Sequence, residues 1–568
     1  MKKIFLSLIM LSVVLCLASC SGGADVPKDG PEVSEDVNPD SIKVESVLGL
    51  NEQIYLNLAK GEYVISYKKA DAEEYTVLDK ELMLENKEKL DCYILGLAKG
   101  LYDVKIEQGE GESYACKTFT DIDVEKQDRS GYAHFGREEG IGGYNNDGTV
   151  KEGAKILYLT NENKNTVTLD INGTTYTGLV EILKANQYME DPLIIRVLDR
   201  ITTNQWKTTE EAPRTKDETM IGDEYFKSLF SDKQGENLAG LSINVYVSKL
   251  DKRFEYVTTP DGIELVAAVD EETSSNDIDA TMLQIENASN VTIEGVGSKA
   301  EIYQFGIGFM YSDSIEVKNL SFRHYPEDGL QLLAYGSAGA CNLHGYYWVH
   351  NNTFKEGLDN WGVGDSDGDE SVSLADVRNV TFSFNKFYKT GKTLILGGWE
   401  YDACLNMTFH HNYYMLCEQR LPLSRNSNIH NYNNYFVSCD RGLSPRVSTY
   451  VFSEANYFDG VGEAYYGDAG SEPWGAVKSF GDIYRSTGVD DIVVKVTERD
   501  AYVENTCKPD EKVDYSKFDT DSELFYYDAE NKCSDVEILH EAKDVPEFVP
   551  QYAGVGILTR MDFPTDAE

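Results

Sequence analysis

A short motif that recurs in the second half of the chain constrains the fold more than any other feature. It is an asparagine, any residue and then an aromatic residue, and its copies begin at Asn352, Asn385, Asn412, Asn434 and Asn456. The distances between copies, 33, 27, 22 and 22 residues, match single coils of a β-solenoid with loops of variable length. Stacked coils lie about 4.8 Å apart, so the asparagines can hydrogen-bond from coil to coil while the aromatic rings stack. The repeat therefore predicts a parallel β-helix.

The region before the repeats has a different pattern. Between residues 41 and 126, short alternating runs such as Tyr63–Tyr67 and Leu101–Ile106 are separated by turn residues, which is typical of antiparallel strands. We predict an all-β chain with a small N-terminal antiparallel β-sandwich of fibronectin or immunoglobulin type over 41–126. A right-handed parallel β-helix should follow over 130–500. Residues 501–568 should form a C-terminal extension of strands and loops that covers the end of the solenoid.

The first residues are typical of an export signal. Met1–Lys3 is basic, Ile4–Leu17 is apolar, and small residues lead to Cys20. The apolar run is too short to span a bilayer as a retained helix, and the residues before Cys20 resemble the bacterial lipobox, in which the cysteine is lipidated. We expect a signal peptide over 1–19, lipidation of Cys20, an acidic tether over 20–40, and a monomer held at the outer membrane only by its lipid.

The formal net charge of −45 limits the possible partners. Nucleic acid is excluded as a partner because its phosphates would be repelled over most of the surface. If the substrate is itself an acidic polymer, its groove must be locally basic or must hold a metal ion.

The cysteines do not indicate a zinc site, because none of their spacings fits one. Export permits disulfides, and two pairings are plausible, Cys92 with Cys116 and Cys507 with Cys533, although connectivity cannot be deduced from sequence. Buried free thiols are the alternative for the cysteines of the repeat region, which are Cys341, Cys404, Cys417 and Cys439.

Over residues 140–462, more than half of the chain, the sequence resembles the family 1 polysaccharide lyases, the pectate lyases. Five anchors occur in the order found in that family: Gly140–Thr149, Val291–Gly297, Trp348–Phe354, Val380–Asn385 and Thr408–Tyr414. The resemblance implies a parallel β-helix that cleaves pectic, galacturonate-rich polysaccharide by β-elimination.

The resemblance also implies roles for three cationic residues. In the segment Arg420–Arg425, the first arginine matches the family's catalytic base, which takes the proton from C5 of a galacturonate. Arg425 matches a residue that grips a substrate carboxylate, and Lys392 matches a lysine that also reaches the sugar acid. β-Elimination builds negative charge beside a carboxylate, so cations held around that carboxylate suit the reaction. Because a guanidinium normally stays protonated, Arg420 needs nearby positive charge, from Lys392, Arg425 and a bound metal, to act as a base.

The resemblance implies Ca²⁺ as a cofactor, held by carboxylates. Asp328 matches a first ligand of the family, but Leu330 stands where the second acid is expected. Asp369 matches a third ligand, and Ser373 stands where the fourth is expected.

A nearby acidic loop offers a compensating calcium site. Residues 365–376 carry acids at positions one, three, five and twelve, much as an EF-type loop does. The glycine normally required at position six is replaced by Glu370. If calcium binds here, Asp365, Asp367 and Asp369 are its expected ligands, and a solvated acidic loop is the alternative.

Three other functions remain open. The partial loss of calcium ligands favours a pectin lyase acting on methyl-esterified polymer, whereas Lys392 and Arg425 favour free carboxylates. A non-catalytic surface glycan-binding β-helix is possible, but the Arg420 segment opposes it. A hydrolase would need paired carboxylates on one strand face, which are missing outside the loop at Asp365. We expect His410 and His411 to have structural roles in the stack.

Overall fold

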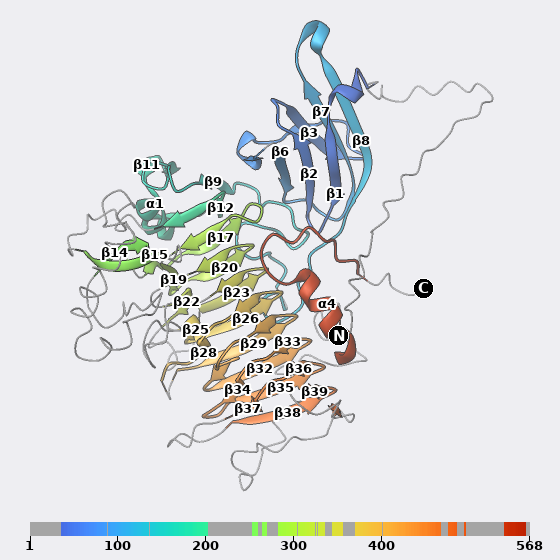
Figure 1. Ribbon diagram of the computed structural model, residues 1–568. Helices are drawn as coiled ribbons and strands as arrows, with labels where there is room; N and C mark the ends of the chain where they lie inside the picture. Colours follow the sequence, from blue (N-terminus) through green and yellow to red (C-terminus); the bar gives the residue numbers. More distant parts are fainter. Residues whose placement is uncertain are drawn as a thin grey trace.

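The computed structural model describes two packed bodies, a small sandwich and a long solenoid (Figure 1). The described residues are 36–87, 89–135, 137–202, 253–258, 264–269, 282–303, 305–323, 325, 328–334, 344–355, 370–399, 402–466, 475–485, 493–495 and 539–563.

Residues 44–124 form the sandwich at the top of Figure 1. One antiparallel sheet has the order β1 (Val44–Gly49), β2 (Gln53–Ala59), β6 (Lys89–Leu95), β5 (Met83–Asn86), and the other has the order β4 (Thr76–Val77), β3 (Val64–Lys69), β7 (Gly100–Gln108), β8 (Ala115–Val124). A single apolar cluster fills the space between the sheets and includes Val296 from the solenoid.

The solenoid consists of three long sheets among the described residues, and almost all of their strand pairs are parallel. Sheet A contains β9 (Lys155–Leu159), β12 (Leu193–Val197), β17 (Ser289–Gly295), β20 (Asp313–Lys318), β23 (His344–His350), β26 (Val377–Ser383), β29 (Cys404–His410), β32 (Ser427–Tyr432), β35 (Tyr450–Glu454) and β38 (Ala476–Phe480). Sheet B contains β13 (Arg200–Thr202), β18 (Glu301–Tyr303), β21 (Ser321–Arg323), β24 (Thr353–Lys355), β27 (Lys386–Tyr388), β30 (Tyr413–Met415), β33 (Tyr435–Val437), β36 (Tyr457–Asp459), β39 (Ile483–Arg485) and the antiparallel β40 (Val493–Lys495). Sheet C contains β16 (Met282–Glu286), β19 (Gly306–Met310), β22 (Leu330–Leu333), β25 (Glu370–Ala375), β28 (Lys392–Leu396), β31 (Leu423–Ser424), β34 (Arg441–Pro445) and β37 (Glu463–Tyr465). The predicted fold class, a parallel β-helix with a small antiparallel N-terminal sandwich, is confirmed.

A few short elements lie outside these sheets. They are the hairpins β10 (Thr168–Ile171) with β11 (Thr174–Thr177) and β14 (Arg253–Thr258) with β15 (Glu264–Val269), the helices α1 (Leu179–Ala185) and α4 (Val545–Tyr552), and five single 3₁₀ turns at Pro39–Ser41, Lys80–Leu82, Gly111–Ser113, Asn186–Tyr188 and Ala542–Asp544.

The predicted asparagine ladder holds the coils in register. The Oδ1 atom of each asparagine accepts hydrogen bonds from the backbone N–H and the Nδ2 of the preceding asparagine, at 2.8–3.1 Å. Each Nδ2 also donates to a strand carbonyl, as Asn412 does to Phe382 at 2.9 Å. The ladder ends at Asp482, whose Oδ1 accepts both hydrogen bonds from Asn456. All of these side chains are buried, so the ladder satisfies polar groups that burial would otherwise leave unpaired.

The aromatic residue of each repeat stacks on its equivalent in the next coil. Ring centroids are 4.5–5.0 Å apart along the series Phe354, Phe387, Tyr414, Phe436 and Phe458, with interplanar angles of 5–8°. These rings belong to one apolar core that runs the length of the solenoid and contains both aliphatic and further aromatic side chains.

The cysteines in the described residues are free thiols. The proposed Cys92–Cys116 pairing is wrong, because both cysteines are free thiols in the structure. Cys404, Cys417 and Cys439 are buried in the core as free thiols, as the alternative reading expected. Cys341, Cys507 and Cys533 lie outside the described residues.

The linker after the sandwich runs over the outer face of sheet A. Threonine hydroxyls on that face accept hydrogen bonds from linker amides, Thr408 from Tyr132 at 3.1 Å and Thr381 from Ala133 at 3.0 Å. Gly131 has a φ of 103°, and a Cβ there would lie 2.6 Å from the Thr381 hydroxyl. The close docking of the linker therefore requires glycine at this position.

A buried charge network lies under the linker at the sandwich end of sheet A. Glu294 pairs with Arg196 at 2.8 Å and with Lys318 at 3.4 Å, and Lys318 also pairs with Glu316 at 3.4 Å. Burial alone would raise the pKa of Glu316, but Lys318 and the hydrogen bond from His350 outweigh it and lower that pKa to about 2. The network thus supplies each buried charge with a partner.

The described part of the C-terminal extension differs from the prediction. Residues 545–552 form helix α4, which lies along the flank of the solenoid rather than over its end (Figure 1). Val545 and Val549 pack against the exposed faces of Tyr413, Tyr435 and Tyr457 on successive coils. Within the described residues, no helix has the length and apolar character needed to cross a bilayer.

Removing one rung of the ladder should destabilise the solenoid. Asn412→Ala deletes the buried hydrogen bonds to Phe382 and Asn434 and leaves Asn385 without its acceptor, so we expect a loss of roughly 3 kcal/mol in the free energy of unfolding. Urea denaturation followed by circular dichroism measures this loss. Asn146→Ala, at an exposed turn, is the matched control and should change stability by less than about 1 kcal/mol. Equal losses in the two variants would contradict the role of the ladder.

Buried neutral histidines should make the protein less stable in mild acid. Burial and the nearby Arg129 charge hold the pKa of His134 well below 6.5, so the folded protein leaves it neutral while the unfolded chain takes up a proton. The free energy of unfolding should therefore fall as pH drops from about 6.5 to 5, by up to about 1.4 kcal/mol per pH unit for this histidine. Glu316 contributes little in that range, because the unfolded chain takes up a proton at this carboxyl only near its ordinary pKa of about 4.5.

Chemical denaturation at several pH values tests this expectation. His134→Phe should reduce the dependence of the free energy of unfolding on pH, because it removes the titrating group. Phenylalanine suits the position, since His134 packs edge-on against Trp348 and makes no hydrogen bond within the described residues. An unchanged slope in this variant would exclude His134 as a source of the acid sensitivity.

Candidate active site

Three coils of sheet C bring the principal predicted residues together. Lys392 begins β28 and lies opposite Glu370 of β25 on one side and Gln419 on the other. The backbone N–H of Leu394 donates to the Arg420 carbonyl at 2.9 Å, so Arg420 follows in the same ladder. Glu370, Lys392 and Arg420 thus occupy one edge of sheet C on consecutive coils, which we call the cationic edge.

An ion pair crosses this edge. The Arg420 guanidinium contacts the Glu370 carboxylate through Nη1 and Oε1; Glu370 is buried, whereas the Arg420 side chain is 22% exposed. The backbone of Arg420 has a φ of 62°, an uncommon conformation for a residue with a side chain, and its N–H donates to the Tyr466 hydroxyl at 3.1 Å. The surroundings therefore hold Arg420 in place with its side chain open to solvent.

The Tyr466 hydroxyl lies between cations. Burial raises its pKa, while the charges of Arg420 and Arg446 act in the opposite direction. Arg441 lies over the Tyr466 ring with its guanidinium carbon 5.2 Å from the centroid. Positive charge therefore gathers next to Arg420 on a strongly negative protein, as an acidic substrate would require.

Arg425 lies at the other end of the short strand β31. Its Nη1 donates to the carbonyl of Gly397 at 2.7 Å, and its side chain is buried. Since Arg425 follows the residue paired with Leu396, it is displaced from Lys392 by most of strand β28, roughly 13–16 Å along the sheet. The structure thus brings Lys392 and Arg420 together but places Arg425 in a second cluster near Asp402.

This second cluster carries an exposed aromatic side chain. Trp399 follows β28 and is 63% exposed, and its backbone N–H donates to Asp402 Oδ2 at 2.9 Å. Burial raises the pKa of Asp402, and the charge of Arg425 opposes that rise. An exposed indole of this kind can stack on a sugar ring.

The predicted calcium ligands are only partly within the described residues. Asp328 is buried; its Oδ1 accepts the Glu370 N–H and its Oδ2 accepts Gln331 Nε2, each at 2.7 Å. At the two positions without acids, Leu330 packs in the apolar core of the solenoid and Ser373 is buried. Asp365, Asp367 and Asp369 lie outside the described residues. Calcium takes six to eight oxygen ligands, so Asp328 and Glu370 alone do not form a site, and the calcium assignment stays a prediction.

Sequence reasoning missed Glu370 as a site residue. It selected the neighbouring Asp369 as a ligand and treated Glu370 only as the residue at the glycine position of the acidic loop. In the structure Glu370 begins β25, pairs with Lys392 and contacts Arg420. One feature of the sequence could have identified Glu370. It lies two residues before the apolar alternation Val372–Leu374, which marks the start of a strand, and in the structure it lies opposite Lys392.

Together, the fold and this edge define a parallel β-helix protein with a cationic site on one sheet. Residues 242–496 match the family model described as pectate lyase. The match covers 255 of the 568 residues, a little less than half of the chain.

Two curated relatives match part of the chain. Pectate lyase 2 of Pectobacterium carotovorum is 30% identical over 192 residues, which are 32% of this chain and 48% of that protein. A pectate trisaccharide-lyase of Bacillus licheniformis is 27% identical over 196 residues, 33% of this chain and 53% of that protein. The chain thus spans about half the length of the curated relatives it matches.

Two solved structures align with about three quarters of this chain. Pectate lyase Bsp165PelA from Bacillus sp. N165, in complex with trigalacturonate, is 18% identical with a TM-score of 0.45, covering 76% of this chain and 99% of its own. Pectate lyase C from Erwinia chrysanthemi, at pH 9.5 with calcium, is 18% identical with a TM-score of 0.42, covering 77% of this chain and 98% of its own.

Proposed function

We propose that this chain is a pectate lyase that cleaves polygalacturonate by β-elimination at the cationic edge. The observation that carries the proposal is the placement of Lys392 and Arg420 on neighbouring coils, beside Glu370, in a protein of net charge −45. An acidic polymer needs such a local concentration of cations in order to bind. The curated relatives that match this region are named for pectate cleavage.

The chemistry fits the two side chains. In the elimination, the C5 proton leaves, the bond from C4 to the glycosidic oxygen breaks, and a C4–C5 double bond forms in the product. Negative charge builds on the carboxylate beside C5, where the Lys392 ammonium stabilises it. Arg420, which is partly exposed on the next coil, removes the C5 proton.

Glu370 controls the protonation of Arg420. A buried carboxylate in contact with a guanidinium favours its charged form, so Arg420 cannot act as a base while this pair is intact. A galacturonate carboxylate is also an anion and competes with Glu370 for the guanidinium. We infer that substrate binding rearranges the pair, so that the base forms only in the complex.

We also propose that a calcium ion assists the reaction. Asp328 and Glu370 are the described carboxylates that would contribute to a site, and Asp365, Asp367 and Asp369 are the predicted remainder. A bound calcium ion would neutralise carboxylate charge next to the substrate. The apolar Leu330 and the neutral Ser373 favour the second candidate, a pectin lyase that acts on methyl-esterified polymer without a metal.

We propose that the enzyme works at the outer membrane, anchored through a lipid on Cys20, and that its partner is pectic polysaccharide. The sequence pattern of residues 1–20 supports the anchor. Residues 1–35 lie outside the described residues. Labelling with a clickable fatty acid, in the natural chain and in Cys20→Ala, would test it.

The substrate assignment predicts a specific pattern of activity. The purified protein should produce ultraviolet-absorbing unsaturated product from polygalacturonate, and a calcium chelator should reduce this rate. Activity restricted to esterified pectin and insensitive to chelator would instead establish the pectin lyase. No unsaturated product from either polymer would leave only the glycan-binding alternative.

The role of Arg420 predicts a large loss of turnover on substitution. Arg420→Ala should lower kcat on polygalacturonate by 10²–10⁴-fold, the usual contribution of a positioned base, and Lys392→Ala should lower kcat/KM as well. Arg378→Ala removes an exposed arginine of β26 and should retain activity, so it controls for the loss of one charge. Full activity in Arg420→Ala would remove the assignment of the base.

A further inference from the structure

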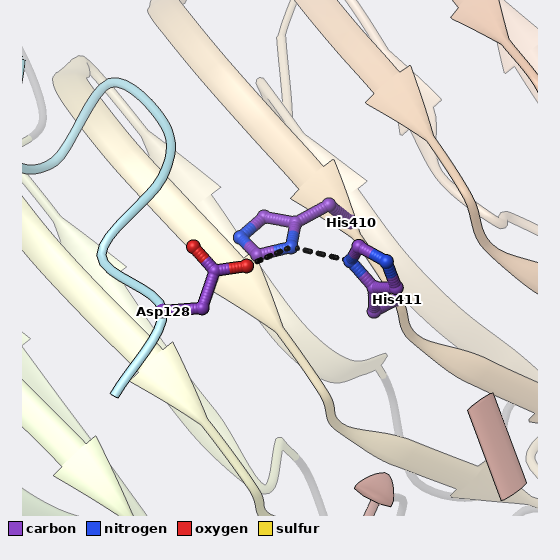
Figure 2. Close-up of side chains that lie close together, drawn as sticks. All are labelled: Asp128, His410 and His411. Carbon is purple, nitrogen blue, oxygen red and sulfur yellow. Dashed lines mark hydrogen bonds and ion pairs between the residues drawn. The ribbon is translucent and has the colours of Figure 1, made fainter. Parts of the chain in front are cut away.

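A cluster of metal-binding side chains lies on the opposite side of the solenoid from the cationic edge. Asp128 comes from the linker after the sandwich, and His410 and His411 come from the end of β29 in sheet A (Figure 2). One ligand atom from each of the three lies within 4.8 Å of the others, and all three side chains are buried. They form the one group of this kind found among the described residues.

The two imidazoles direct their Nδ1 atoms at the same point. These atoms are 2.9 Å apart, and His410 Nδ1 lies 4.0 Å from Asp128 Oδ2. The rings are nearly perpendicular, at 87°. Each ring is fixed by stacking, His410 on Tyr432 and His411 on Phe384, with centroid distances of 4.9 Å.

Hydrogen bonds alone do not account for this arrangement. Two Nδ1 atoms at 2.9 Å must share one hydrogen, and the distance of 4.0 Å from His410 to the carboxylate is too long for a hydrogen bond. A cation placed between the three groups would accept a lone pair from each of them.

The surrounding contacts resemble the outer shell of a metal site. Asp128 Oδ1 accepts hydrogen bonds from the Ser130 N–H at 2.9 Å and from the Ser130 hydroxyl at 2.5 Å, which leaves Oδ2 directed at His410. His411 Nε2 lies 3.1 Å from Nδ1 of His540 in the C-terminal segment. A metal-bound histidine commonly donates its second N–H to such an acceptor, which fixes the ring orientation.

We propose that Asp128, His410 and His411 bind a structural Zn²⁺ ion that fastens the linker to the solenoid, with His540 as the outer partner of His411. Imidazole and carboxylate are ligands that zinc accepts, whereas calcium prefers oxygen ligands only. The ion joins segments 282 residues apart in the chain, and through His540 it also orders the C-terminal segment that carries α4. The site is separate from the cationic edge and does not depend on the proposed lyase activity.

Metal analysis of the untagged, purified chain tests the proposal. After removal of metals with a chelator and incubation with Zn²⁺, the protein should retain about one zinc per chain. X-ray absorption at the zinc edge should show nitrogen and oxygen ligands at about 2.0–2.2 Å and no sulfur. Zn²⁺ should raise the unfolding temperature by several degrees.

Variants locate the ion. Asp128→Asn and His411→Gln should each weaken zinc binding by at least about tenfold. The matched control is His430→Gln, which removes a buried histidine from the next coil of sheet A, where it bonds Glu454 at 3.1 Å, and it should bind zinc as the natural chain does. Failure of the natural chain to retain zinc, or binding that is equal in all three variants, would overturn the proposal. Because the natural chain is itself measured, a variant that does not fold cannot decide the outcome.

Discussion

The hydrogen-bonded asparagine ladder is the constraint on which the rest of the structure depends. Each rung joins a side chain to the backbone and the side chain of the next coil, so a shift of one residue would break every bond at once. The stacked rings beside the ladder impose the same register. With the register fixed, loops of different lengths leave from the coils without disturbing the alignment of the strands.

That alignment assembles the cationic edge. Glu370, Lys392 and Arg420 are separated by 22 and 28 residues, yet they lie on consecutive coils because β25, β28 and the segment before β31 are paired. The site carries positive charge on a protein of net charge −45, and the buried Glu370 offsets part of it. One strand register therefore produces two features of the site. It gathers the cations that bind an acidic polymer, and it places Glu370 where it restrains Arg420.

The sequence predicts the fold where its pattern is periodic. The Asn-x-aromatic repeat predicts the β-helix because equivalent positions recur once per coil, and the resemblance to pectate lyases places Lys392 and Arg420 on adjacent coils. Glu370 was missed because it follows directly after Asp369 in an acidic segment. A shift of one residue there decides which of the two is assigned to the site. The cluster of Asp128 with His410 and His411 could not be predicted, since its parts are far apart and no repeat relates them. Helix α4 was missed because Pro550 lies inside it and is unfavourable for a helix in isolation, and packing against Tyr413, Tyr435 and Tyr457 outweighs that preference.

The three sheets of the solenoid have different tasks in this account: sheet C carries the chemistry, sheet A receives the linker, and the tyrosines that begin three strands of sheet B receive helix α4. The central claim is that the galacturonate chain binds on sheet C across Lys392 and Arg420. A crystal structure of the Arg420→Ala protein with a bound galacturonate oligomer tests it most directly. The account predicts a sugar carboxylate in contact with Lys392 and a C5 hydrogen directed at the position vacated by the Arg420 side chain. An oligomer bound elsewhere, with Lys392 making no contact to it, would contradict the account.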